Sequence, residues 1–274
     1  MAERMRMESS RAPCQDLTIR GTEIHTFSGD GFQVDPGRSA PGWNNVTIEG
    51  SHIWLAPLPA PENGFAAGIV PGENAIDTKS SPSLPRASIA IRDTTMHGFG
   101  AGLIGNMAAV NLKENIEATV DRVTVYDSEI AFRLRGPTST TPAGAWVTLT
   151  NAVIHSVDTA FRYENDIETA KIWNVTLGTR VTRAFQAASS SSTGLDVRNL
   201  LTISPLAAEA WHSSNLQVGL NAFVNAAAHE YRLAAGAVAV DMGSTIAAVT
   251  TDRVGVSRPQ NSGYDVGAYE QPRN

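Results

Sequence analysis

Six short segments of the sequence place charged residues at matching positions. They read DGFQVD, NAIDTK, AAVNLK, IAFRLR, TAFRYE and RAFQAA, and begin at Asp30, Asn74, Ala108, Ile130, Thr159 and Arg183. Alternate side chains of a strand face opposite ways, so the fourth and sixth positions of each segment share one face. The fourth positions are Gln33, Asp77, Asn111, Arg133, Arg162 and Gln186, and the sixth positions are Asp35, Lys79, Lys113, Arg135, Glu164 and Ala188.

The sixth positions bring three cations together if the six strands are neighbours. Strands lie about 4.8 Å apart, so Lys79, Lys113 and Arg135 would stack with no carboxylate between them in their column. Like charges facing each other across strands are destabilising. Nearby carboxylates can relieve Lys79 and Arg135, whereas we expect Lys113 to have the least compensation, with the adjacent Glu114 able to fold back toward it. An external anion would fit there.

The spacing of this column matches an acidic polysaccharide. A uronate polymer repeats about every 5 Å, so successive strands can contact successive sugar rings through charge-assisted hydrogen bonds. We therefore expect an anionic polysaccharide as partner, with substrate-binding positions at Asp35, Asn111, Arg133, Arg162 and Glu164. The alternative is a solvent-facing polar strip whose flexible cationic groups simply avoid one another.

The same cations could carry catalysis. Polysaccharide β-elimination needs a base that removes the proton next to a carboxylate, and a cation that neutralises that carboxylate. Neighbouring cations disfavour the charged form of a lysine, so either Lys79 or Lys113 is a candidate base. Arg135 completes the expected catalytic set. Paired-carboxylate hydrolysis is the weaker alternative, because no cluster of aspartates stands out in the sequence.

A calcium site is a further candidate in the same region. Its expected ligands are Glu73, Asn74 and Asp77, close to Asp35 and Asn111, because Ca²⁺ takes several oxygen ligands. Two alternatives stay open. Asn74 can instead be a turn asparagine of the kind that stacks in repetitive folds, and Asp77 can pair with Lys79 or an arginine.

The elements that position these residues repeat along the chain. Each unit has a first strand, a bend, a second strand, a turn and a third strand, as in LTIRGTEIH from Leu17 followed by DGFQVD. Stacking such units buries the inward columns and pairs each interior strand, which predicts an all-β, right-handed, single-stranded parallel β-helix of about seven coils. A propeller or a sandwich fits less well, because each unit offers only three short strands. The inward columns are Phe32, Ile76, Val110, Phe132, Phe161 and Phe185, then Val34, Thr78, Leu112, Leu134, Tyr163 and Ala187.

Long loops and an aromatic column accompany the early repeats. The loops after Asp35, Trp54 and Lys79 either wall one side of a cleft or are tolerated insertions. The second strands end in aromatic or histidine residues that either stack on sugar rings or pack at a corner of the coil. This column is His25, Trp54, His97, Tyr126 and His155.

The tail of the sequence carries a family resemblance. It contains YRL at Tyr231, then DRVGVSRP from Asp252 and DVGAYE from Asp265. This ending resembles that of bacterial right-handed β-helix proteins of the pectate-lyase-like superfamily. The resemblance implies a structural cap that includes Asp252, Arg258, Asp265 and Glu270, and it implies Lys or Arg bases with calcium in several lyases. We expect a truncated N-terminal cap in residues 1–16, coils in 17–204, and terminal coils with an irregular C-terminal cap in 205–274.

Composition limits the remaining possibilities. Lys plus Arg is 21 and Asp plus Glu is 27, a formal charge of −6, which argues against nucleic-acid binding. The single cysteine, Cys14, allows no internal disulfide. No apolar run is long enough to insert into a membrane, and the opening MAERMRMESS lacks the apolar centre of a secretion signal. We nevertheless expect a monomer at the bacterial surface or outside the cell, with an upstream signal lost.

These observations favour a lyase that cleaves a uronate-containing glycan by β-elimination. Two other classes remain open, a non-catalytic carbohydrate-binding module and a structural surface protein. A lyase should release unsaturated products that absorb in the ultraviolet, whereas a binding module should bind without turnover.

Overall fold

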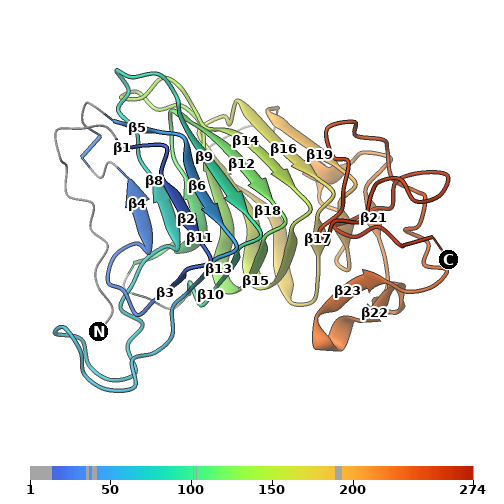
Figure 1. The fold of residues 1–274 in the computed structure, drawn as a ribbon, viewed down its shortest axis with the longest axis horizontal. Coiled ribbons are helices and arrows are strands. Elements are labelled where there is room, and N and C mark those ends of the chain that lie inside the picture. The colour runs from blue at the N-terminus through green and yellow to red at the C-terminus, as the bar shows by residue number, and fades with distance from the viewer. Residues whose placement is uncertain are drawn as a thin grey trace.

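The computed structural model describes residues 14–34, 37–38, 42–100, 102, 104–188 and 193–273. Within these ranges the chain winds as a coil whose strands stack along the long axis of the molecule, from the N-terminal end to the C-terminal end (Figure 1). Asp35 lies outside the described residues, so its expected roles stay predictions.

The first face is a regular parallel sheet of seven strands. Neighbouring strands pair in parallel in the order β19-β16-β14-β12-β9-β6-β2. Such pairing between consecutive turns of the chain is what the repeat predicts. The strands are β2 (Thr18–Arg20), β6 (Val46–Glu49), β9 (Ala87–Arg92), β12 (Ile116–Asp121), β14 (Trp146–Thr150), β16 (Thr169–Trp173) and β19 (Leu195–Arg198).

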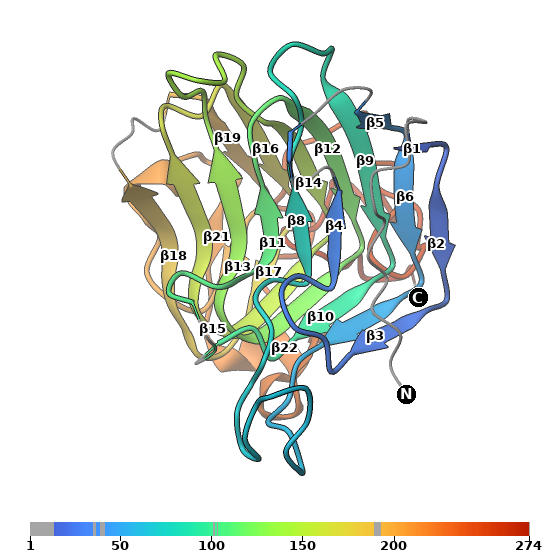
Figure 2. The ribbon, with the colours of Figure 1, turned by 90° about the vertical axis from the view of Figure 1, so that its left-hand side faces the viewer.

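The second and third faces share two long strands, β13 (Thr124–Arg135) and β15 (Val153–Glu164), which continue around a corner. The other strands of the second face are β3 (Glu23–His25), β7 (His52–Trp54), β10 (Thr95–His97), β17 (Thr176–Leu177), β20 (Leu201–Thr202) and β21 (Leu216–Gln217). The third face adds β4 (Phe32–Val34), β8 (Ile76–Thr78), β11 (Ala108–Leu112) and β18 (Val181–Ala188). Figure 2 looks along the coil and shows the three faces around one interior. A further pair, β1 (Cys14–Gln15) and β5 (Trp43–Asn44), lies beside them.

One residue in the left-handed backbone region makes the bend between the first and second strands of every coil. Its φ lies between 49° and 59° throughout, a conformation tolerated best by glycine, asparagine and aspartate. Five of the seven positions are Gly or Asn, and the other two are Asp and Arg. The residues are Gly21, Gly50, Asp93, Arg122, Asn151, Asn174 and Asn199.

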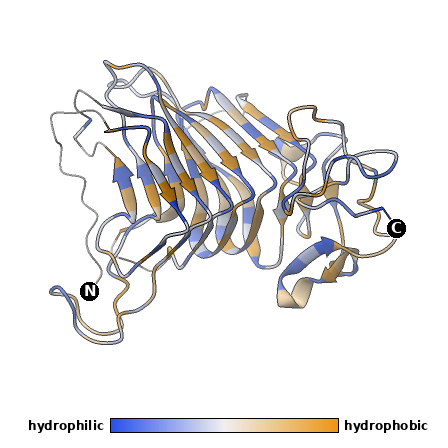
Figure 3. Ribbon diagram, viewed as in Figure 1, coloured by the Kyte–Doolittle hydropathy of each residue, from blue (hydrophilic) through white to orange (hydrophobic). Residues whose placement is uncertain are grey.

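The interior is filled by the columns predicted from the sequence. Phe132 and Phe161 are 0% and 1% exposed, and their rings stack at 5.8 Å. All of the inward positions are buried except Ala187, which is exposed. That assignment was wrong because β18 pairs on one side only, with β15, so no further strand shields its end. Apolar and polar residues alternate along these strands (Figure 3).

Parallel pairing of successive coils confirms the β-helix and is incompatible with a sandwich or a propeller of antiparallel blades. The C-terminal part carries three short 3-10 helices, η1 (Ala208–Ala210), η2 (Leu220–Ala222) and η3 (Ala226–Ala228), and an antiparallel hairpin of β22 (Phe223–Asn225) and β23 (Glu230–Leu233). No helix in the described ranges is both long and apolar enough to span a membrane.

The C-terminal tail contains a buried ion pair. Arg258 and Glu270 contact each other at 2.7 Å, with side chains that are 0% and 1% exposed. The same carboxylate accepts the backbone N–H of Asp265, and Asp252 accepts the N–H of Glu270. All four residues are buried, so their contacts are structural.

Candidate functional site

The register places the charged columns side by side on the third face. Gln33 pairs with Asp77, Asp77 with Asn111, Asn111 with Arg133, and Arg133 with Arg162. The predicted alignment of the fourth positions is therefore confirmed.

The expected solvent-facing strip is wrong in one respect. Asp77, Asn111 and Glu164 are only 1%, 3% and 6% exposed, although they point away from the interior. Long cationic side chains lie over these short ones and remove them from water. The carboxylates form a buried lower layer and the cations a more exposed upper layer.

Asp77 is the anionic centre of the early coils. Its Oδ2 accepts a hydrogen bond from Gln33 Nε2 at 2.9 Å and contacts Lys113 Nζ at 3.0 Å and Lys79 Nζ at 3.5 Å. Lys113, for which we expected the least compensation, thus has a carboxylate partner, because an aspartate in the neighbouring coil reaches it. Both lysines nevertheless share one oxygen, so a single negative charge serves two ammonium groups.

Glu114 and Glu164 are shared in the same way. Glu114 contacts Arg38 at 2.6 Å and Arg135 at 3.3 Å. Glu164 contacts Arg133 and Arg162, each at 2.8 Å, and Arg135 at 3.4 Å. Burial raises the pKa of each glutamate, but hydrogen bonds and the charges of the arginines together outweigh it, and the net shift of the pKa is downward. Both glutamates therefore stay ionised.

We call the resulting group the cation ladder. Among the described residues, its six cations contact three carboxylates, Asp77, Glu114 and Glu164. The cationic side chains keep between 15% and 28% of their surface exposed, while those of the carboxylates keep 8% or less. Excess positive charge therefore faces solvent. The cations are Arg38, Lys79, Lys113, Arg133, Arg135 and Arg162.

Arg38 was missed in the sequence because it lies in a loop outside the repeat. Besides Glu114, its guanidinium donates to the Ser80 carbonyl at 3.4 Å and to Thr141 Oγ1 at 3.3 Å. Arg38 therefore contacts side chains that belong to later coils. No sequence periodicity points to it.

The described residues do not fit the expected calcium site. Asn74 Oδ1 accepts the backbone N–H of Ala108 at 2.9 Å, and Asn74 Nδ2 donates to Asp30, so Asn74 has the alternative role of a stacking turn residue. Asp77 Oδ1 and Asn111 Oδ1 are buried without a hydrogen-bond partner. Two such oxygens beside two lysines fall short of the roughly six to eight ligands that Ca²⁺ takes. Glu73 is half-buried, and no cluster of three or more potential His, Cys, Asp or Glu metal ligands occurs in the described part of the chain.

Asp30 is a second residue that sequence reasoning passed over. It is half-buried at the upstream end of the ladder, and burial, followed by the charge of Asp77, raises its pKa to about 6. A signal was available, because Asp30 begins the first charged segment at the position that Asn74 has in the second.

The column at the ends of the second strands forms a stack of rings. His25 lies 4.5 Å from Trp54, His97 lies 4.5 Å from Tyr126, and His155 lies 5.1 Å from Tyr126, all within 16° of parallel. His229 of the C-terminal region stacks on His155 at 4.1 Å. The ring faces contact one another along this column. We call it the aromatic ladder.

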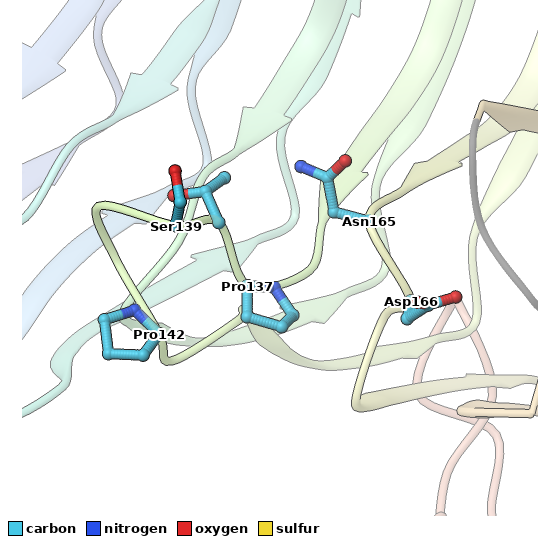
Figure 4. Close-up of a pocket in the computed structure, with 6 residues that line it drawn as sticks. Pro137, Ser139, Pro142, Asn165 and Asp166 are labelled. Atoms are coloured by element: carbon cyan, nitrogen blue, oxygen red, sulfur yellow. The ribbon is translucent and has the colours of Figure 1, made fainter.

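Two depressions lie beside these columns. A cavity of about 660 Å³ lies just beyond the ends of β13 and β15, and is lined by Pro137, Thr138, Ser139, Pro142, Asn165 and Asp166 (Figure 4). Another of about 600 Å³ is lined on one side by the loop after β7, through Leu55, Pro57 and Val70, and on the other by acidic residues such as Asp127 and Glu129. That loop projects from the body of the coil (Figure 2). Neither cavity is lined by a member of the cation ladder.

Comparisons with known proteins bear on the fold. No protein-family model matches the sequence, and no curated protein matches it significantly. The structure is similar to the crystal structure of pectate lyase Pel9A, with a TM-score of 0.56 and 14% sequence identity. The match covers 94% of this chain and 66% of that one, so this chain spans just under two thirds of the length of the pectate lyase. At this identity the similarity confirms the parallel β-helix.

Proposed function

We propose that this protein binds an acidic polysaccharide along the cation ladder and cleaves it by β-elimination. The proposal rests on one observation: among the described residues, six cations share three buried carboxylates, and the cationic side chains are the more exposed layer. A uronate polymer supplies one carboxylate per sugar, so it can neutralise the excess charge over several coils at once. The resemblance to pectate lyase Pel9A in fold is consistent with such a substrate.

Within this proposal, the two lysines that contact Asp77 have different roles. Lys113 makes the closer contact, at 3.0 Å against 3.5 Å, so it is the principal charge partner of Asp77. Lys79 makes the longer contact with Asp77 and is the more exposed, with 23% of its side chain accessible against 15%. We assign Lys79 as the base that removes the C5 proton of a uronate, and Lys113 and Arg135 as the cations that hold its carboxylate.

An absorbance assay tests the proposal. Pectate, alginate and glycosaminoglycans are incubated with the protein, and unsaturated products are followed in the ultraviolet. We expect turnover of at least one substrate and a loss of at least about a hundredfold in kcat for Lys79→Ala, the usual scale for a general base. Lys171→Ala on the first face is the matched control and should keep full activity. No absorbance change with any of the substrates would refute the lyase.

A non-catalytic binding module is the second candidate. It is favoured by the contacts of Lys79 and Lys113 with Asp77, which occupy the ammonium groups that a base would need free. Isothermal titration with the same polysaccharides separates the two functions. Binding that Lys113→Ala weakens, together with no turnover by the unmodified protein, would establish the module.

A further inference from the structure

Asp30 lies at the edge of the cation ladder and is not one of the residues assigned to binding or to proton removal. It precedes β4, and its Oδ1 accepts two hydrogen bonds from Asn74, from the backbone N–H at 3.2 Å and from Nδ2 at 2.7 Å. Its Oδ2 accepts from Gln33 Nε2. Both oxygens are fixed in place by these hydrogen bonds, and the residue stays half-buried, so part of it is accessible to solvent.

Gln33 connects Asp30 to the lysine pair. The same Nε2 that contacts Asp30 also donates to Asp77 Oδ2, which contacts Lys79 Nζ. Asp77 is 1% exposed and cannot touch a bound polymer. Asp30 and Lys79 are therefore the accessible groups at the two ends of one polar chain that crosses the first two coils.

The two ends differ in chemistry. Burial is the main cause that raises the pKa of Asp30 to about 6, and the charge of Asp77 adds to it, while the hydrogen bonds from Asn74 act in the opposite direction. A much larger fraction of Asp30 is thus protonated near neutral pH than of an ordinary aspartate. An elimination can use a base that removes the C5 proton together with an acid that protonates the leaving oxygen, and an amine and a carboxylic acid can fill these two roles.

We propose that Asp30 is the general acid of the elimination, the group that protonates the departing glycosidic oxygen; this inference rests on the proposed function. In the balanced step, Lys79 Nζ takes the proton from C5, a double bond forms between C4 and C5, and the C4–O bond breaks. The proton of Asp30 moves to the leaving oxygen, which becomes a hydroxyl. Asp30 ends as carboxylate and Lys79 as ammonium, and exchange with water restores both.

Asp30→Asn tests the role, because asparagine keeps an oxygen that accepts from Asn74 but has no acidic proton. We expect kcat on a natural polyuronate to fall by about a hundredfold or more, within the usual range for general acid catalysis. Activity should stay within about threefold of the unmodified protein on a uronide with an aryloxy leaving group at C4, which departs without protonation. The inflection near pH 6 in kcat/KM should also disappear.

The controls separate a catalytic from a structural role. Asp158→Asn, at an exposed aspartate within β15, should leave the turnover of both substrates unchanged. Thermal denaturation and titration calorimetry should show unchanged folding and polyuronate affinity for Asp30→Asn. Equal losses on both substrates, or no loss on either, would overturn the assignment while the lyase stands. If the unmodified protein produces no unsaturated product, the proposed function fails and this inference fails with it.

Discussion

The cation ladder and the aromatic ladder are built by the same repeat and run along the same axis, but they differ in how far their members satisfy one another. Every ring of the aromatic ladder contacts the next, so the column is complete without a ligand. The cation ladder places cations over a buried layer of carboxylates, and within the described part of the chain it has twice as many cations as carboxylates. Stacking by itself therefore does not indicate function. What distinguishes the two columns is charge that the fold leaves uncompensated.

Reversing one charge at the centre of the cation ladder should have the largest effect. Lys113→Glu places a second carboxylate beside Asp77 and lowers the charge of the ladder by two. We expect polyuronate affinity to fall by more than a hundredfold, about 3 kcal/mol by calorimetry. The reason is that the attraction between Lys113 and a carboxylate of the polymer is replaced by repulsion between two carboxylates. Lys171→Glu on the first face makes the same change in net charge and should alter affinity less than threefold. Equal effects of the two variants would mean that only net charge matters.

Acid should act mainly on the aromatic ladder. Burial, then the neighbouring His229 and Arg180, lowers the pKa of His155 to about 4 from an ordinary value of 6.5. The folded protein therefore favours neutral His155, and this stability is fully present above pH 6.5 and is lost as the pH falls toward 4. The expected loss is about 2 to 3 kcal/mol in the free energy of unfolding, measured by denaturant titration at each pH.

His155→Phe keeps a ring in the column but cannot titrate, so it should remove most of this acid dependence. His25→Phe is the matched control at the exposed end of the same column and should retain it. Asp30 should change stability with pH in the opposite direction to His155, because its raised pKa lowers the free energy of unfolding as the pH rises from about 4 to about 6. An unchanged acid profile in His155→Phe would show that another group controls it.

The repeat predicted most of the fold, and the reason is physical. Alternation within strands fixes which side chains face the interior, and equal spacing fixes the register, so Phe32, Ile76 and Val110 could be aligned from their letters alone. The exposure of Ala187 could not be predicted, because it depends on where the ladder of third strands ends.

The candidate site was less predictable than the fold. The register placed the lysines correctly. A long side chain can contact residues of its own coil or of a neighbouring one, however, and the contact of Lys113 with Asp77 of the preceding coil depends on the conformation of the lysine side chain. Arg38 arrives from a loop that no period describes. The raised pKa of Asp30 depends on burial and on a neighbouring charge, neither of which can be read from residue types. Columns follow from sequence, whereas charge balance requires the folded chain.

Removing a carboxylate from the cation ladder increases its excess positive charge, whereas Lys113→Glu decreases it. Glu164 contacts three arginines and is 6% exposed, so Glu164→Gln leaves their charges closer to one another without a shared anion. We expect a loss of about 2 kcal/mol in the free energy of unfolding, below the range for fully buried pairs because the arginines are partly exposed. Added polyuronate should raise the Tm of this variant more than that of the unmodified protein. Equal shifts would indicate that the polymer does not replace the missing charge.

The smallest effect is expected from a ring in the middle of the aromatic ladder. Tyr126 lies between His97 and His155, at 4.5 Å and 5.1 Å, and Tyr126→Leu keeps an apolar side chain while removing both stacking contacts. Aromatic pairs contribute about 0.5 to 1.5 kcal/mol beyond their buried area, so we expect a loss of about 1 kcal/mol in the free energy of unfolding. Polyuronate affinity and turnover should not change, because no ring of this column belongs to the cation ladder. If Tyr126→Leu weakened binding while folding was intact, sugar rings would have to contact the aromatic ladder, and the two columns would form one binding surface.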